Sequence, residues 1–164
     1  MNKNLMTTID VGGLDFAVYL EPDNTDAGPP WENSDCHGPV SEWTTRKKTP
    51  GEIVLCEDRN SRRYYDYQEA CRIARKDGWG YEGSTGTKRE IAAKAAMRDY
   101  NYLRQWCDDQ WSYVGVTVEL LDDDGDETGI CESLFGVEDI GDYCLEVAKE
   151  LGNEIILSCR RMAA

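Results

Sequence analysis

The stretch SYVGVTVELLDDDGDETGICESLF, residues 112–135, decides the fold class. Apolar and polar residues alternate over its first ten positions, where Val114, Val116 and Val118 share one face, and this two-residue period is typical of a β-strand. A second strand is expected over 129–135. The segment between the two strands contains Asp-Gly, which is the strongest short signal for a hairpin turn. The stretch therefore predicts an antiparallel β-hairpin.

Five carboxylates fill that turn: Asp122, Asp123, Asp124, Asp126 and Glu127. An EF-hand calcium loop needs glycine at position 6, an oxygen ligand at position 1 and glutamate at position 12. With Gly125 at position 6, Leu120 and Cys131 take the other two positions. With Gly129 at position 6, Phe135 takes position 12. Both registers fail, so we expect a solvated hairpin turn and no metal site.

Working outward, hydrophobic periodicity and turn residues predict strands at 14–20, 41–45, 52–56 and 62–65 and helices at 67–78, 87–109 and from about 137 onward. Asp66 and Gly78 are suited to cap the first helix. This order predicts an α+β fold, with an antiparallel sheet of hairpins and about three helices packed on one side. We expect a single α+β domain over residues 1–164, with a long Pro/Gly-rich loop at 21–40.

The charge and the cysteine content indicate which partners and which cellular compartment to expect. The net charge is −14, with +5 in residues 46–104 and −12 in residues 105–164. Such an acidic chain repels nucleic acid and favours basic partners. No membrane span and no signal peptide are expected. The seven cysteines are odd in number and form no C-x-x-C pair, which, with no signal peptide expected, predicts reduced thiols in a cytosol. Four are expected as small core residues: Cys71, Cys107, Cys131 and Cys144.

Catalytic chemistry finds little support in the sequence. His37 is the single histidine and is expected as a solvated turn residue, without zinc or a Cys–His dyad. The Gly-rich segment 80–90 departs from P-loop spacing, so Thr85 or Thr87 is expected to cap a helix there. Asp99 falls on the apolar face of that helix and needs a partner, either a structural Arg or Tyr or a functional site with a raised pKa. We predict no catalytic residue and no cofactor.

Two interaction sites of opposite charge remain. The turn acids and a second acidic group, Glu138, Asp139 and Asp142, have spacings that allow a graded anionic surface competing with DNA for a basic groove. Trp31, in the long loop, is the expected aromatic anchor of this surface. The alternative is a nucleic-acid site at a hairpin tip, built from Arg59, Arg62, Arg63, Tyr64 and Tyr65.

The segment HGPVSEWTTRKKTPGEIVLCEDRNSRRYYDYQEACRIARKDGWG, residues 37–80, resembles a family of small acidic proteins of tailed bacteriophages and prophages. The resemblance continues through KREIAAKAAMRDYNYLRQWCDDQWSYVGV, residues 88–116, and EVAKEL, residues 146–151. It implies a phage protein in the host cytoplasm, of the class of anti-CRISPR and anti-restriction inhibitors. The resemblance carries over no catalytic residue.

From charge and resemblance together we expect a non-enzymatic inhibitor that blocks the basic surface of a host defence complex. The alternative is an accessory protein of phage DNA metabolism, which uses the basic middle segment.

Overall fold

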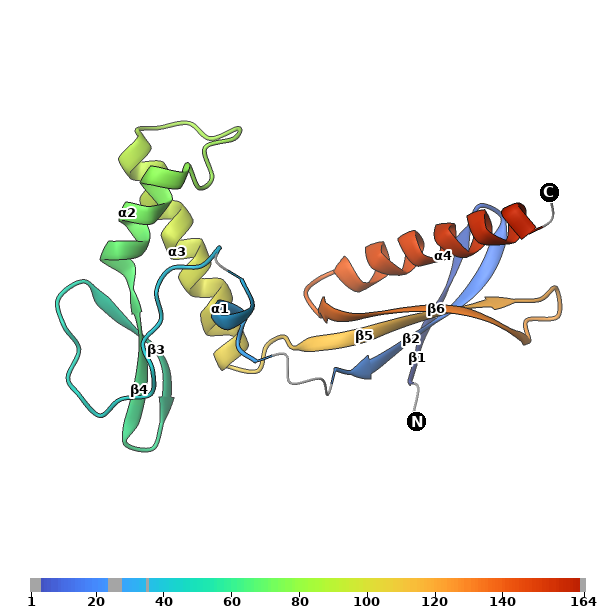
Figure 1. Ribbon diagram of the computed structural model, residues 1–164, viewed down its shortest axis with the longest axis horizontal. Helices are drawn as coiled ribbons and strands as arrows, with labels where there is room; N and C mark the ends of the chain where they lie inside the picture. The colour runs from blue at the N-terminus through green and yellow to red at the C-terminus, as the bar shows by residue number, and fades with distance from the viewer. Residues whose placement is uncertain (1–3, 24–27, 35, 163–164) are drawn as a thin grey trace. The chain divides into compact units, whose positions relative to one another are not determined.

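The computed structural model describes residues 4–23, 28–34 and 36–162. The chain divides into two compact units, each with its own hydrophobic core (Figure 1). Unit 1 comprises Met1–Ala27 and Trp111–Ala164, and unit 2 comprises Gly28–Gln110. The sequence predicted one domain, whereas the two cores share no buried residue. The order of elements concealed this division, because unit 2 is inserted in the chain between two strands that pair with each other.

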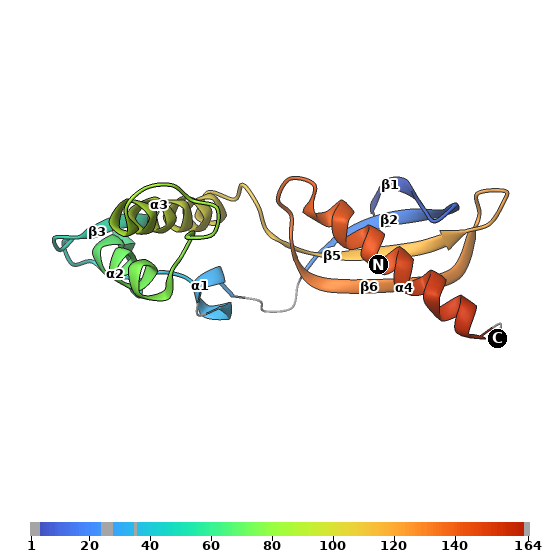
Figure 2. The same cartoon turned by 90° about the horizontal axis from the view of Figure 1, so that it is seen from above.

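Unit 1 is a four-stranded antiparallel sheet with one long helix. Its elements are β1 (Asn4–Val11), β2 (Leu14–Pro22), β5 (Tyr113–Leu121), β6 (Glu127–Glu138) and α4 (Tyr143–Met162). The strand order is β1-β2-β5-β6, and every neighbouring pair is antiparallel. Figures 1 and 2 show α4 lying along one face of this sheet. The predicted hairpin is confirmed, since Thr117 of β5 pairs with Ser133 of β6.

The core of unit 1 joins the inward face of the sheet to α4. Phe16, Val116 and Val118 are fully buried in it. Gly152 lies where the helix approaches β1 most closely, and a Cβ added there would be 3.1 Å from Val11 Cγ2. This close approach explains why a glycine in the middle of α4 does not end the helix, although glycine lowers helix propensity.

Unit 2 packs helices against a two-stranded hairpin. Its elements are α1 (Pro30–Asn33), β3 (Glu52–Asp58), β4 (Ser61–Asp66), α2 (Tyr67–Asp77) and α3 (Lys88–Cys107). The expected caps are confirmed: Asp66 accepts a hydrogen bond from the Glu69 amide, and Gly78 ends α2 with a φ of 74°. Thr87 and Glu90 form a capping box at the start of α3, as expected, and it occupies the amides of these two residues.

The α+β class is confirmed, but the helices are divided between the units, and α4 alone packs on the four-stranded sheet. Three segment predictions need correction. The expected strand at 41–45 forms only an isolated bridge from Thr44 to Arg62, because that segment follows the edge of β4 irregularly. The loop expected at 21–40 is shortened by the end of β2 and contains α1; residues 24–27 and 35 lie outside the described residues. The last helix begins at Tyr143 rather than near 137.

The cysteines depart from the prediction of reduced thiols. Cys56 on β3 and Cys107 at the end of α3 form a disulfide that spans 51 residues of sequence. Cys144 is buried as expected, Cys71 is half-buried, and Cys131 is exposed on β6 rather than in the core. Among the described residues, no helix combines the length and the apolar character needed to cross a membrane.

Candidate acidic interaction surface

The net charge of the chain lies in one unit. Unit 1 contains 18 acidic and 4 basic residues, a net charge of −14. Unit 2 contains 14 acidic and 14 basic residues, a net charge of zero. The structure shows five ion pairs between described residues, and both partners of each belong to unit 2. Unit 1 therefore presents most of its charge without internal neutralisation.

The turn between β5 and β6 carries the first cluster of acids. Asp122 organises the turn, because its Oδ1 accepts hydrogen bonds from the amides of Asp124 at 3.0 Å and Asp126 at 2.9 Å. Gly125 supports the same turn with a φ of 85°. The carboxylates of Asp123, Asp124 and Asp126 are exposed and have no hydrogen-bond partner among the described residues. Three of the five predicted acids are thus free to meet a partner.

Glu127 serves a different purpose from its neighbours. Its carboxylate accepts a hydrogen bond from the hydroxyl of Tyr19 on β2. That bond, followed by desolvation and the charges of Glu127 and Glu119, raises the pKa of Tyr19 to about 12. Tyr19 is therefore a neutral donor at ordinary pH, and Glu127 ties β6 to β2 across β5.

The second predicted cluster lies at the other end of the hairpin. Tyr113 at the start of β5 pairs with Glu138 at the end of β6, while Leu121 pairs with Glu127 beside the turn. Because β5 has 9 residues, its two ends are about 27 Å apart. Asp139 and Asp142 follow in the connection to α4 rather than on a helical face, and Asp142 lies just before the first turn of the helix. The acids thus form two clusters rather than one continuous face.

Trp31 belongs to unit 2, whereas both acidic clusters belong to unit 1. It lies on α1 in unit 2, half-buried, with its ring edge-to-face against Trp106 at a centroid distance of 5.4 Å. The Arg63 guanidinium lies 5.1 Å from the Trp31 ring and 5.0 Å from the Trp43 ring. Trp31 is committed to the packing of unit 2, and Trp43, at 43% exposure, is the more accessible tryptophan.

Only some of the residues predicted for the alternative nucleic-acid site are exposed to a ligand. Arg59 is exposed in the β3–β4 turn, and Arg62 binds Glu57 at 2.7 Å. Tyr64 and Tyr65 are buried at 2% and 0% exposure, so their rings cannot stack on bases. The sequence pattern could not reveal this, because adjacent aromatic residues on a strand face opposite sides, and here a helix and a loop cover both sides.

Asp99 lies in a buried polar cluster. The sequence predicted its need for a polar partner but not the participation of His37. Asp99 accepts hydrogen bonds from the Tyr65 hydroxyl at 2.7 Å and the Gly38 amide at 2.8 Å, and its Oδ1 lies 2.6 Å from His37 Nδ1. Burial and then the bond to Asp99 raise the pKa of Tyr65. The expected tyrosine partner is therefore confirmed.

His37, expected in solvent, is instead a half-buried partner stacked on Tyr102 at 5.5 Å. A chemical signal for this pairing existed, since the single histidine and the single carboxylate on an apolar helix face each require a polar partner. The cluster holds the 37–38 segment against α3. No nucleophile lies in hydrogen-bond contact with His37 among the described residues.

The described residues contain no group of His, Cys, Asp or Glu side chains that could hold a metal ion. The exposed acids of unit 1 can act chemically as fixed negative charge: they attract cationic surfaces, with a strength that falls as salt rises. Comparison of the chain with protein-family models, with curated proteins and with solved structures finds no match.

Proposed function

We propose that this protein is a non-enzymatic interaction protein whose acidic unit covers a basic, nucleic-acid-binding surface of another protein. The observation that carries the proposal is the partition of charge, with a net charge of −14 in unit 1 and zero in unit 2. If acidity served solubility alone, no such confinement to one folded unit would be required.

The geometry supports binding at two points rather than along a continuous stripe. Asp123, Asp124 and Asp126 project from one end of the β5–β6 hairpin, and Asp139 and Asp142 are exposed at the other end. The separation of about 27 Å is close to the rise of about eight base pairs, which carry about 16 phosphate charges at one charge per roughly 1.7 Å of duplex axis. A groove that holds one turn of duplex could therefore engage both clusters.

The target class follows from the resemblance to small acidic proteins of tailed phages. We propose a host defence complex with a nucleic-acid groove, of the kind that anti-CRISPR and anti-restriction proteins inhibit. The proposed location in the bacterial cytoplasm rests on this resemblance and not on the cysteines, two of which form a disulfide. The exposed carboxylates would replace phosphates on the lysines and arginines of that groove.

A capture experiment tests the proposal. Tagged protein is passed through lysate of a bacterium that carries defence systems, at low and at moderate salt, and retained proteins are identified by mass spectrometry. The decisive variant is Asp123→Asn/Asp124→Asn/Asp126→Asn, which removes three charges without touching the turn-organising Asp122. The matched control removes three exposed charges from unit 2: Asp58→Asn, Asp77→Asn and Glu82→Gln.

We expect a nucleic-acid-binding protein to be retained by the wild type and by the control, and to be released by salt or by the unit 1 variant. Equal retention by both variants would contradict the proposal.

A further inference from the structure

A groove in unit 2 carries charge opposite to that of unit 1. It has a volume of about 670 Å³ and lies along β3 beside the second half of α3. The charged side chains that line it are Lys47, Lys48, Arg62, Arg104 and Glu57. Four cations against one carboxylate give the lining a charge of +3, within a chain whose net charge is −14.

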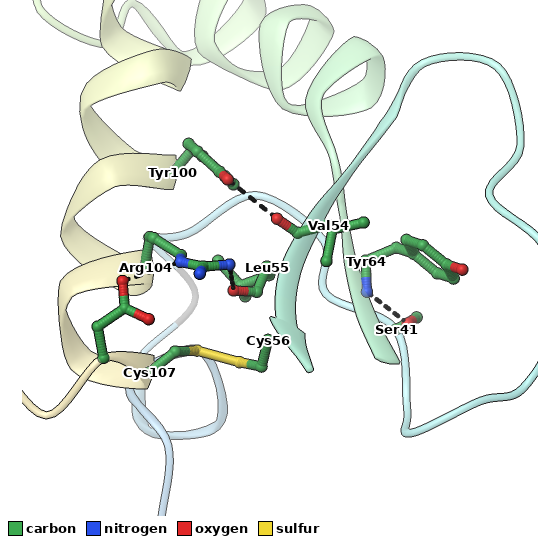
Figure 3. The surroundings of a disulfide bond; sticks show 9 residues. Ser41, Val54, Leu55, Cys56, Tyr64, Tyr100, Arg104 and Cys107 are labelled. Atoms are coloured by element: carbon green, nitrogen blue, oxygen red, sulfur yellow. Dashed lines mark hydrogen bonds and ion pairs between the residues drawn. A yellow bond between two sulfur atoms is a disulfide. The ribbon is translucent and has the colours of Figure 1, made fainter. Parts of the chain in front are cut away.

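The wall of this groove is held by specific bonds between β3 and α3 (Figure 3). Tyr100 donates its hydroxyl to the Val54 carbonyl at 2.9 Å, and Arg104 Nη1 donates to the Leu55 carbonyl at 2.8 Å. The Cys56–Cys107 disulfide joins the same two elements one step further along. Arg104 is therefore mounted on a cross-linked frame, and Arg62 lies on the strand paired with β3, which limits the entropy that these two side chains lose when a ligand binds; Lys47 and Lys48 lie in the segment before β3.

The cations differ in how far the protein already uses them. Arg62 Nε binds Glu57 Oε1 at 2.7 Å and Arg104 Nε binds Asp108 Oδ2 at 2.9 Å, yet the two arginine side chains remain 53% and 39% exposed. Lys47 and Lys48 are exposed, and no ion pair joins either to another described residue. The groove therefore presents two ammonium groups outside the ion pairs of the described residues, beside two arginines that are each paired with one carboxylate and still partly exposed.

We propose that this groove binds a ligand that carries two or more phosphate groups. Several cations around one volume require more than one anionic group, and the planar donors of arginine fit phosphate oxygens. The volume lies in the range of small-molecule sites, roughly 300–1,000 Å³. Tyr64 is buried with the Arg46 guanidinium over its ring, and the half-buried Tyr100 ring packs against Tyr65 at a centroid distance of 5.7 Å, so both lining tyrosines are used for packing within unit 2. Recognition is therefore of phosphate and independent of base sequence.

This site belongs to unit 2 and uses none of the acids on which the proposed function depends. Loss of either activity therefore leaves the other intact. Two kinds of ligand supply several phosphate groups that this groove would bind in the same way: the polyphosphate chain of a nucleotide and the backbone of a single-stranded polynucleotide.

The test measures binding to the full-length oxidised chain by isothermal titration calorimetry. The probes are tripolyphosphate, adenosine triphosphate, a thymidine dodecamer and inorganic phosphate, each at about 50 and 200 mM salt. The variant is Lys47→Gln/Lys48→Gln, whose exposed side chains leave the fold intact. Lys76→Gln/Lys88→Gln removes the same charge from exposed positions of unit 2 outside the groove.

We expect at least one polyphosphate probe to bind the wild type and the control alike, and to bind Lys47→Gln/Lys48→Gln at least tenfold more weakly. A dodecamer that binds more tightly than the triphosphates, with steep salt dependence, identifies a polynucleotide; the reverse order identifies a nucleotide. An equal loss of affinity in both double variants would overturn the proposal. Inorganic phosphate that binds as tightly as tripolyphosphate would also overturn it and would indicate an adventitious ion only.

Discussion

The two units are stabilised by different interactions. Unit 1 buries an apolar face of four strands under one helix, and the ion pairs that the structure shows between described residues include none of its exposed acids. The described part of unit 2 has two strands, too few for a stable sheet alone. The Cys56–Cys107 disulfide and hydrogen bonds from Tyr65 to Asp99 and from Arg104 to the Leu55 carbonyl join these strands to α3. In unit 1 the hydrophobic core supplies most of the stability, so surface residues can carry unpaired charge. In unit 2 the core is small, and polar side chains and the disulfide stabilise the fold.

The first prediction separates the two cores. Phe16→Ala removes a fully buried ring from unit 1 and should lower its stability by about 3–5 kcal/mol, while Leu103→Ala should cost unit 2 about 2–5 kcal/mol. Hydrogen exchange, read by mass spectrometry, measures each unit separately. We expect each substitution to lower protection in its own unit. If either substitution destabilises both units equally, the units form one cooperative structure and the comparison fails.

The second prediction concerns the disulfide. Closing a loop of 51 residues stabilises unit 2 by about 4 kcal/mol in the chain-entropy model. Cys56→Ser/Cys107→Ser should therefore lower the urea midpoint of unit 2 and leave unit 1 unchanged. Cys36→Ser, which removes an exposed free thiol, is the matched control. A midpoint for unit 2 that does not respond would show that the cross-link contributes nothing.

The sequence predicted those features of the two units that depend on residues close together in the chain, and it missed those that depend on residues far apart. Local signals were sufficient for the Asp66 cap, the Gly78 helix end and the β5–β6 turn, because each depends on neighbours within a few residues. The division into units was missed because β2 pairs with β5 across the whole of unit 2, and no local pattern encodes that distance.

The candidate site was predicted by residue type but not by position. The predicted acids are exposed except for Glu138, which is half-buried, and their two clusters lie at opposite ends of one hairpin. The β1 strand escaped notice because most of its residues, Asn4–Val11, are exposed and their hydrophobic alternation is weak. The disulfide was missed because pairing between Cys56 and Cys107 depends on α3 lying beside β3.

The third prediction addresses the Asp99 cluster. Asp99→Ala leaves the buried Tyr65 hydroxyl and the Gly38 amide with fewer partners, at a cost of about 1–3 kcal/mol to unit 2. Glu82→Ala, at an exposed position of the same unit, should change the urea midpoint little. Equal midpoints for the two variants would mean that the cluster does not hold the 37–38 segment against α3.

The fourth and smallest effect is a dependence on pH. Arg46 lowers the pKa of Glu52 from 4.5 to about 2, chiefly through their hydrogen bonds. A folded-state pKa below the unfolded value stabilises the fold above pH 4.5, and this contribution is lost as pH falls from 4.5 to about 2. Urea denaturation across that range should show a shallower loss for unit 2 in Arg46→Gln than in the wild type. Parallel curves for the two proteins would exclude the Arg46–Glu52 pair as the cause.

The most direct test of the central claim is a displacement measurement with the captured partner protein. A fluorescent DNA duplex is bound to the partner, and the present chain is titrated in while anisotropy is followed. We predict that the wild type displaces the duplex, and that Asp123→Asn/Asp124→Asn/Asp126→Asn requires about tenfold more protein, equivalent to about 1.4 kcal/mol. If the partner binds this chain and the duplex at the same time, with no loss of anisotropy, the acidic unit does not cover a nucleic-acid surface and the account is contradicted.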